Sequence, residues 1–287
     1  MIRDARQLKA KIQQLAKGDS LKSQIYLRNY FMERFLERIS VSRYWTRFVL
    51  KGGLLIASFV GLDLRSTMDI DSTVRNMSLD LEAGRKIILE IINVHLEDNV
   101  DFIISKGSEI MEEHDYPGIR FTLQGRFDGI QQAIRIDLST GDVITPGAVS
   151  YKYKLMFEDR SIHLMTYNLE TLIAEKLETM ITRGTANTRM RDFYDIYLLT
   201  QENDFDLSTL KEAILNTSQK RGTASLLKDY KVIMHDVAES PIMESAWNNF
   251  VKQSYFAEGL IWKNVLQACI WLSERVLSEE LSHKHKS

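Results

Sequence analysis

The chain has little cysteine, little proline and no long apolar segment among its 287 residues. Its single cysteine, Cys269, cannot form an internal disulfide, and three prolines leave little room for long linkers rich in that residue. Residues 1–20 are polar and charged, and no later segment is long and apolar enough to cross a bilayer, so we expect neither a signal peptide nor membrane contact. The net charge of −2 argues against indiscriminate coating of nucleic acid. These absences predict a cytoplasmic protein.

The composition is that of a globular protein, with 44% hydrophobic and 26% charged residues. The length exceeds that of a usual single domain, so we expect two lobes. The pattern predicts an α+β (mixed α/β) fold, in which residues 1–160 form N-terminal helices and a lobe with a small mixed sheet, and residues 161–287 form a helical lobe. Cys269 lies in an apolar helical stretch and is expected to pack in the core rather than to act as a nucleophile.

Lys51-Gly52-Gly53 is the most informative short motif. The residues before it, 48–50, read as a buried strand, and residues 54–59 read as an apolar helix that Gly61 ends. Two glycines at such a junction allow a phosphate to approach free backbone N–H groups, and the helix dipole favours an anion there. The alternative is a tight turn without a ligand, because short motifs have a high false-positive rate.

A pair of carboxylates follows in Met68-Asp69-Ile70-Asp71. Alternation along a strand places Asp69 and Asp71 on one face, whereas Met68 and Ile70 are expected to face the core. Asp137 lies at the end of another alternating segment, on the face opposite to its apolar residues. If the two strands pair, three carboxylates come together and would favour a divalent cation. The alternative is a set of solvated aspartates at strand edges.

Lys176 lies in the middle of an apolar stripe on a helix predicted over residues 169–183, with Gly184 as its end. Either Thr166 or Asn168 can cap the start of this helix. A lysine at such a position must extend its ammonium to solvent, find a carboxylate or point towards an anion. A triphosphate is the favoured partner in a protein that also has a phosphate-binding turn and an acidic triad.

The next predicted helix, residues 190–200, carries Asp192 and Asp195 three positions apart, beside Arg189 and Arg191. An ion-paired surface that fixes two helices together explains Asp195 best. Asp192 and Arg191 are also candidates for a binding site.

These motifs, with Arg65-x-Thr67 before the acidic pair, together resemble the AbiEii toxin family of the polymerase-β-like nucleotidyltransferase superfamily. The resemblance covers about residues 20–200 and includes the later segments Glu175-Lys176-Leu177, Arg183 and residues 191–199. It implies a nucleotidyltransferase-fold lobe in which the catalytic and metal-binding residues are Asp69, Asp71 and Asp137. The residues implied to bind a nucleoside triphosphate are Lys51, Gly52, Gly53, Arg65, Thr67, Lys176, Arg191 and Asp192. Related families more often have Gly-Ser at the turn, so here position 53 supplies no hydroxyl.

The resemblance further implies a function and partners. It implies transfer of a nucleoside monophosphate from a triphosphate, with Mg²⁺ (or Mn²⁺) as cofactor, to a hydroxyl of an RNA such as the 3′ end of tRNA, with the nucleotide in a cleft between the lobes. The same resemblance implies GTP binding and a role as a toxin in abortive infection and antiviral defence. It also implies a separately encoded antitoxin that acts without a stable complex. Transfer to a protein, a phosphotransferase activity, and nucleotide binding without turnover remain alternatives.

The remaining pattern predicts a helix over residues 20–40, a helix near 81–96, and strands near 101–105 and 119–123. Three arginines interleave with the apolar residues of the first helix. Arg28, Arg34 and Arg38 are more often part of a solvated face in such a pattern than a contact with RNA. Tyr151-Lys152-Tyr153-Lys154 alternates aromatic and basic residues, which is typical of a half-exposed strand and less often of a nucleic-acid contact. From Thr166 onward the pattern is helical, with a last helical region over residues 245–281.

Overall fold

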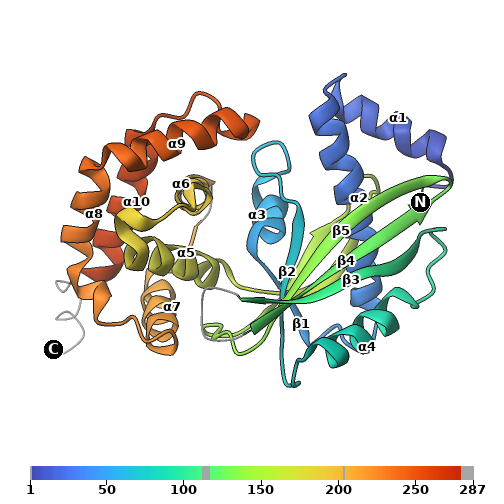
Figure 1. Ribbon diagram of the computed structural model, residues 1–287, viewed down its shortest axis with the longest axis horizontal. Helices are drawn as coiled ribbons and strands as arrows, with labels where there is room; N and C mark the ends of the chain where they lie inside the picture. The colour runs from blue at the N-terminus through green and yellow to red at the C-terminus, as the bar shows by residue number, and fades with distance from the viewer. Residues whose placement is uncertain (1, 112–116, 203, 279–287) are drawn as a thin grey trace. The chain divides into compact units, whose positions relative to one another are not determined.

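The computed structural model describes residues 2–111, 117–202 and 204–278 (Figure 1). Its strands are β1 (Phe48–Lys51), β2 (Asp69–Val74), β3 (Asp101–Met111), β4 (Pro117–Phe127), β5 (Ile130–Ser139), β6 (Val149–Lys154) and β7 (Ser161–Thr166). Its α-helices are α1 (Ala5–Ala16), α2 (Ser20–Val41), α3 (Gly52–Val60), α4 (Leu81–Ile92), α5 (Leu169–Arg183), α6 (Met190–Glu202), α7 (Leu207–Lys220), α8 (Tyr230–Glu239), α9 (Pro241–Gln253) and α10 (Trp262–Leu277). Among the described residues, no helix is long and apolar enough to cross a membrane. The seven strands and ten α-helices of the described residues make the fold mixed α/β, as predicted.

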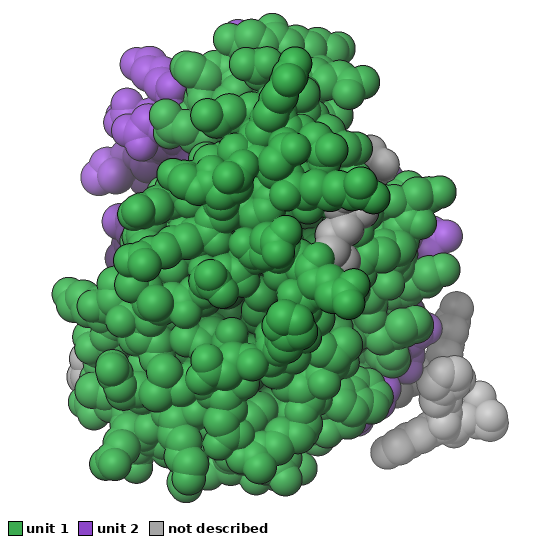
Figure 2. All heavy atoms as spheres, turned by 90° about the vertical axis from the view of Figure 1, so that its right-hand side faces the viewer, with its two compact units in different colours: residues 1–142, 148–167 green, residues 143–147, 168–287 purple. Residues whose placement is uncertain are grey.

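The chain forms two compact units, coloured separately in Figure 2. The sheet unit consists of residues 1–142 and 148–167, and the helical unit consists of residues 143–147 and 168–287. Strand β7 belongs to the sheet unit because it pairs with β1 and β6. The sequence pattern, which placed the division between residues 160 and 161, did not indicate this strand.

All seven strands of the described chain form one mixed sheet in the order β3-β4-β5-β2-β1-β7-β6. Strands β1 and β2 are antiparallel neighbours, joined through the turn at Gly52 and helix α3. Strand β5 lies parallel to β2 and antiparallel to β4. The expected pairing of the Asp69 strand with the Asp137 strand is thus confirmed, and it brings distant parts of the chain to the centre of the sheet.

Helices α2 and α4 cover the same face of the sheet. A side chain at Gly125 in β4 would meet Phe31 of α2, and Phe121, four residues earlier on that strand, packs against Gly84 of α4. Residues four apart on a strand face the same way, so both helices lie on the apolar side. The alternate residues of β4 and β5 point away from this core and carry the polar side chains of the sheet.

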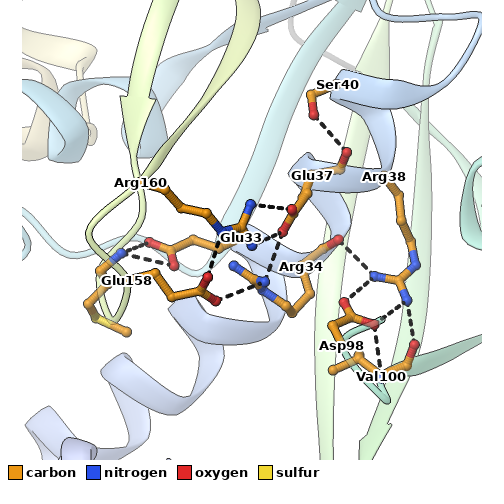
Figure 3. A network of polar contacts seen from close by, with 10 residues as sticks. Glu33, Arg34, Glu37, Arg38, Ser40, Asp98, Val100, Glu158 and Arg160 are labelled. Atoms are coloured by element: carbon orange, nitrogen blue, oxygen red, sulfur yellow. Dashed lines mark hydrogen bonds and ion pairs between the residues drawn. The ribbon is translucent and has the colours of Figure 1, made fainter. Parts of the chain in front are cut away.

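Helix α2 buries arginines that the sequence pattern placed on a solvated face. The side chains of Arg34 and Arg38 are 1% and 3% exposed, so that expectation is wrong for both. Arg38 donates two hydrogen bonds to Asp98, at 2.8 and 3.0 Å, and Arg34 lies 2.8 Å from a carboxylate oxygen of Glu37 (Figure 3). The partners come from other segments or from the next helical turn, which a periodicity argument on one helix does not reveal.

Glu33 on the same helix accepts hydrogen bonds from the backbone N–H of Met156, at 3.0 and 3.1 Å, and from Asn29, at 3.0 Å. Burial raises the pKa of Glu33 to about 8, although the charge of Arg34 and these donors oppose the shift. A carboxyl with a raised pKa in the folded state binds its proton there while the unfolded chain has lost it. The folded protein therefore loses stability as the pH rises from about 4.5 to about 8.

We expect the free energy of unfolding to fall by at least about 1 kcal/mol between pH 5 and pH 8 from this group. The Glu33→Gln variant keeps the shape of the side chain without its titration, so its stability should depend less on pH over the same range. Urea denaturation of both proteins at the two pH values measures the difference. Equal pH dependence in the two proteins would show that Glu33 does not titrate in this range.

The helical unit begins with α5, whose bounds match the predicted helix. Asn168 precedes α5, but its side chain does not cap the backbone, because Asn168 Oδ1 instead accepts a hydrogen bond of 2.7 Å from the Thr171 hydroxyl. The helix ends at Gly184, which adopts a positive φ of 49°. Cys269 on α10 is fully buried, and burial raises the pKa of its thiol. The expectation that Cys269 packs in the core is confirmed.

Two other expectations differ from the structure. Met68 is 47% exposed rather than core-facing, because β2 begins only at Asp69 and the alternation does not extend back to it. The last helical region is divided into α9 and α10, with residues 254–261 between them. Its expected end at Leu281 lies outside the described residues.

Candidate active site

The turn between β1 and α3 brings the backbone against a carboxylate. Lys51 is extended, and Gly52, with φ of 68°, begins the helix. A Cβ at position 52 would lie 2.3 Å from Oδ2 of Asp71, which no side chain tolerates. Position 52 is therefore restricted to glycine both by its conformation and by the closeness of Asp71. The free N–H groups at the start of α3 lie beside the acidic strand.

The second glycine of the turn faces two polar side chains. A Cβ at Gly53 would lie 2.9 Å from Nη2 of Arg65 and 2.9 Å from Oγ1 of Thr67. Both residues are buried, and a serine at position 53 would have to displace them. The missing hydroxyl at this turn thus has a structural reason, since Arg65 and Thr67 fill the space in which it would lie.

Four charged residues form a row across four adjacent strands. The registers place Lys51 opposite Asp71, Asp71 opposite Asp137, and Asp137 opposite Arg120. Residues directly opposite on neighbouring strands share a face. Two carboxylates therefore lie in the middle of the row, with a cation at each end, and Asp69 lies on the same face one pair further along β2.

Arginines from neighbouring strands hold two of these aspartates. Arg120 on β4 donates two hydrogen bonds to Asp137, from Nε to Oδ1 at 2.7 Å and from Nη2 to Oδ2 at 2.5 Å. Arg135 on β5 lies opposite Asp69, and its Nε is 2.6 Å from Asp69 Oδ1. The hydrogen bonds to Asp137, together with the charges of Asp69 and Asp71, raise the pKa of Arg120 against the effect of burial. The Arg120 guanidinium therefore lies in the electrostatic field of all three aspartates.

A third arginine, Arg28 of α2, lies near this cluster. Burial lowers the pKa of Arg28, the positive charge of Arg135 lowers it further, and the negative charge of Asp69 opposes both. Sequence reasoning assigned Arg28 to a solvated face and did not select Arg120 or Arg135. The alternation of β4 and β5 already placed these two on the polar side of their strands, but only the register shows which carboxylates they face.

Lys51 is held by a carboxylate that the sequence did not indicate. Its ammonium lies 2.7 Å from Oδ2 of Asp142, and the same oxygen accepts hydrogen bonds of 2.9 Å from the Ser139 and Tyr167 hydroxyls. Burial alone would raise the pKa of Asp142, but Lys51 and the two hydroxyls outweigh it and lower the pKa. This network fixes Lys51 at the end of the charged row.

The acidic residues suit a divalent cation by their chemistry. Carboxylate oxygens are the ligands that Mg²⁺ and Mn²⁺ prefer, and Asp69, Asp71 and Asp137 lie on one face of adjacent strands. Within residues 2–111, 117–202 and 204–278, no three acidic, histidine or cysteine side chains are already arranged to hold a metal ion. Arg120 and Arg135 each lie against carboxylate oxygens that a cation would use.

The predicted residues of the helical unit form a separate cluster. The Lys176 ammonium lies 2.8 Å from Asp192 Oδ1 and 2.7 Å from Asp195 Oδ2, so α5 and α6 are joined by a buried ion pair. Arg189 also contacts Asp192, with Nε at 2.8 Å from Oδ2. The guanidinium of Arg191 lies 6.0 Å from the centre of the Phe256 ring. Lys176 thus has the carboxylate partners that its position in an apolar stripe required.

Comparison with known proteins identifies the family. The family model described as "Nucleotidyl transferase AbiEii toxin, Type IV TA system" matches residues 34–268. Among solved structures, a candidate nucleotidyltransferase from H. pylori is 13% identical, with a TM-score of 0.46 over 91% of this chain and 98% of that chain. JHP933 from Helicobacter pylori is 14% identical, with a TM-score of 0.45 over 91% of this chain and 95% of that chain.

A third solved structure is an antigenic nucleotidyltransferase-like protein from Paracoccidioides brasiliensis. It is 12% identical, with a TM-score of 0.31 over 85% of this chain and 92% of that chain. Curated proteins give no match to the sequence.

Proposed function

This chain belongs to the AbiEii family of nucleotidyltransferases from type IV toxin–antitoxin systems, and we propose that it transfers a nucleoside monophosphate from a triphosphate to an RNA hydroxyl, such as the 3′ end of tRNA. Asp69, Asp71 and Asp137 are the proposed catalytic residues and Mg²⁺ ligands. The observation that carries the proposal is the register that places Asp71 between Lys51 and Asp137, beside the Gly52 turn.

The sheet unit offers separate contacts for the phosphates and for the reacting hydroxyl. The N–H groups at the start of α3 and the side chains of Arg65 and Thr67, which face Gly53, are proposed to bind the triphosphate. Lys51 adds a positive charge at the end of the row. Asp137, the most buried of the three aspartates, is proposed to orient the acceptor hydroxyl and to take part in removing its proton.

A divalent ion bound by the three carboxylates would neutralise charge on the phosphates and lower the pKa of the attacking hydroxyl. The residues that would hold that ion are positioned by the fold: Asp71 is fixed against Gly52, and the β2–β5 register fixes Asp137 opposite it. Mg²⁺ or Mn²⁺ is thus the proposed cofactor.

In the helical unit, Lys176, Arg191 and Asp192 are proposed triphosphate contacts. Lys176 supplies a positive charge, and Asp192 orients its ammonium at 2.8 Å. Because Asp195 also binds this ammonium, at 2.7 Å, Lys176 would have to share or give up one carboxylate to reach a phosphate. GTP is the proposed nucleotide by family resemblance.

The family implies an antitoxin partner and a nucleoside triphosphate substrate. We propose further that the toxin serves antiviral defence by abortive infection, and that the antitoxin acts without forming a stable complex with this chain. Both follow from the family resemblance, and co-purification of the two proteins at equal amounts would contradict the second.

Labelled nucleotides test the proposed reaction directly. The protein is incubated with Mg²⁺, total RNA or total protein, and each triphosphate labelled at its α-phosphate. Label is expected in RNA. Label in protein would favour protein nucleotidylation, transfer of a γ-label would favour a phosphotransferase, and no transfer of either label would favour nucleotide binding without turnover.

A further inference from the structure

We propose that Arg120 is a removable counter-ion of the acidic cluster: it holds Asp137 until a triphosphate takes the guanidinium and frees the carboxylate for a metal ion. Metal binding would then depend on the nucleotide. This inference rests on the proposed function, because it assigns Arg120 a part in assembling the same site. It is a positioning role that the reaction itself does not require.

The geometry of the pair supports exclusive occupation of Asp137. Both oxygens of Asp137 accept hydrogen bonds from Arg120, at 2.7 and 2.5 Å, so the guanidinium covers the edge of the carboxylate that a cation would use. Strand pairing fixes this arrangement, since β4 and β5 place the two residues directly opposite each other. A metal ion must therefore displace Arg120 or bind fewer carboxylate oxygens.

The exposures of the two side chains show which partner can move. The Asp137 side chain is 9% exposed, whereas the Arg120 side chain is 36% exposed. A nearly buried carboxylate needs a cation or hydrogen-bond donors at all times. The more exposed guanidinium can turn towards a phosphate, and a metal ion can then replace it on Asp137.

Arg135 makes a single ion pair with another carboxylate of the cluster, in place of the two hydrogen bonds between Arg120 and Asp137. Its Nε lies 2.6 Å from Asp69, and the two side chains are 40% and 28% exposed. Asp71, between the two pairs, is held against the Gly52 turn instead. A triphosphate carries enough negative charge to bind two guanidinium groups, which gives both arginines a new partner when the carboxylates take up the metal.

The test uses one substitution with two measurements of opposite expected sign. In Arg120→Met, Mn²⁺ alone should bind about tenfold more tightly than in the wild type, about 1.4 kcal/mol, because the competing cation is gone. Free Mn²⁺ is followed by electron paramagnetic resonance. Inorganic triphosphate in the presence of EDTA should bind about tenfold more weakly, as measured by calorimetry, because the guanidinium that receives it is gone.

Arg126→Met is the matched control, since Arg126 is exposed on the same side of the same strand. Both affinities should stay within about twofold of wild type in this variant, about 0.4 kcal/mol. If Arg120→Met does not fold, Arg120→Gln, which also removes the charge, and Arg135→Met replace it, with the same two signs expected. Weaker binding of both Mn²⁺ and triphosphate would overturn the proposal in favour of a structural role, and so would unchanged affinities.

The outcome is separable from the proposed function. Opposite shifts in a protein that transfers no labelled nucleotide to RNA would support the counter-ion role and contradict the proposed reaction. Transfer to RNA without the opposite shifts would support the reaction and overturn the role of Arg120.

Discussion

Replacing Lys176 with methionine is expected to lower the free energy of unfolding by about 3–5 kcal/mol. The Lys176 ammonium is the cation between Asp192 and Asp195, whose side chains are 3% and 0% exposed. Methionine fills a similar volume without the charge, so the loss comes from two buried carboxylates that no longer have this partner. Arg189 retains its contact with Asp192, which offsets part of this loss.

Urea denaturation measures this effect, with Lys263→Met as the control. Lys263 is exposed on α10 of the same unit, and its replacement should change stability by no more than about 0.5 kcal/mol. A loss below about 1 kcal/mol in Lys176→Met would show that the ion pair contributes little. Triphosphate affinity of Lys176→Met is measured under conditions in which the variant is folded. Weaker binding there would indicate that Lys176 contacts the triphosphate directly.

Replacing Asp137 with asparagine is expected to reduce transfer by about 10²–10⁴-fold. Asparagine keeps the shape but removes the charge that binds a metal ion and assists loss of the hydroxyl proton. Triphosphate binding should remain, because the N–H groups of the turn and the side chains of Arg65 and Thr67 are unchanged. Arg120 would lose its bidentate partner and should then be more available to a phosphate.

The two readouts are the rate of label transfer and the affinity for triphosphate. Asp101→Asn serves as the control, because Asp101 is an exposed carboxylate on β3 of the same sheet, and it should leave both unchanged. Loss of transfer together with loss of binding would indicate that Asp137 supports the structure of the site rather than the reaction. Wild-type transfer would remove Asp137 from the site.

The local part of this site could be predicted from the sequence. This pattern depends only on neighbours in the chain. Lys51-Gly52-Gly53 lies between an apolar strand and an apolar helix, and two alternating aspartates follow. The structure has this order, with β1, α3 and β2 in sequence. It also confirms that the Asp137 strand pairs with β2, the pairing that an acidic triad requires.

The parts that could not be predicted depend on partners far away in the chain. Arg120 faces Asp137 and Arg135 faces Asp69 because of the register between strands, which a single sequence does not specify. Arg34 and Arg38 are buried because Glu37, Glu158 and Asp98 meet them inside the sheet unit. A charged residue on a helix was therefore assigned to solvent when its counter-ion lay on another element.

Strand β7 shows a different failure. Residues 161–166 alternate between exposed or half-buried and buried positions, with Ile162, Leu164 and Thr166 buried, so the signal was present. Helix α5 begins only three residues after this strand, so the short alternating pattern runs directly into a helical one. The roles of Asp69, Asp71, Asp137 and the triphosphate-binding residues remain predictions.

The measurement that tests the central claim most directly compares pyrophosphate release with nucleotide incorporation. Wild-type protein, Mg²⁺, an α-labelled triphosphate and RNA should give one pyrophosphate for each nucleoside monophosphate joined to the RNA. Asp71→Asn should give neither product while its circular dichroism spectrum and triphosphate affinity stay close to wild type. Equal yields from the wild type and Asp71→Asn, or label in RNA without pyrophosphate release, would contradict nucleotidyl transfer at this acidic strand.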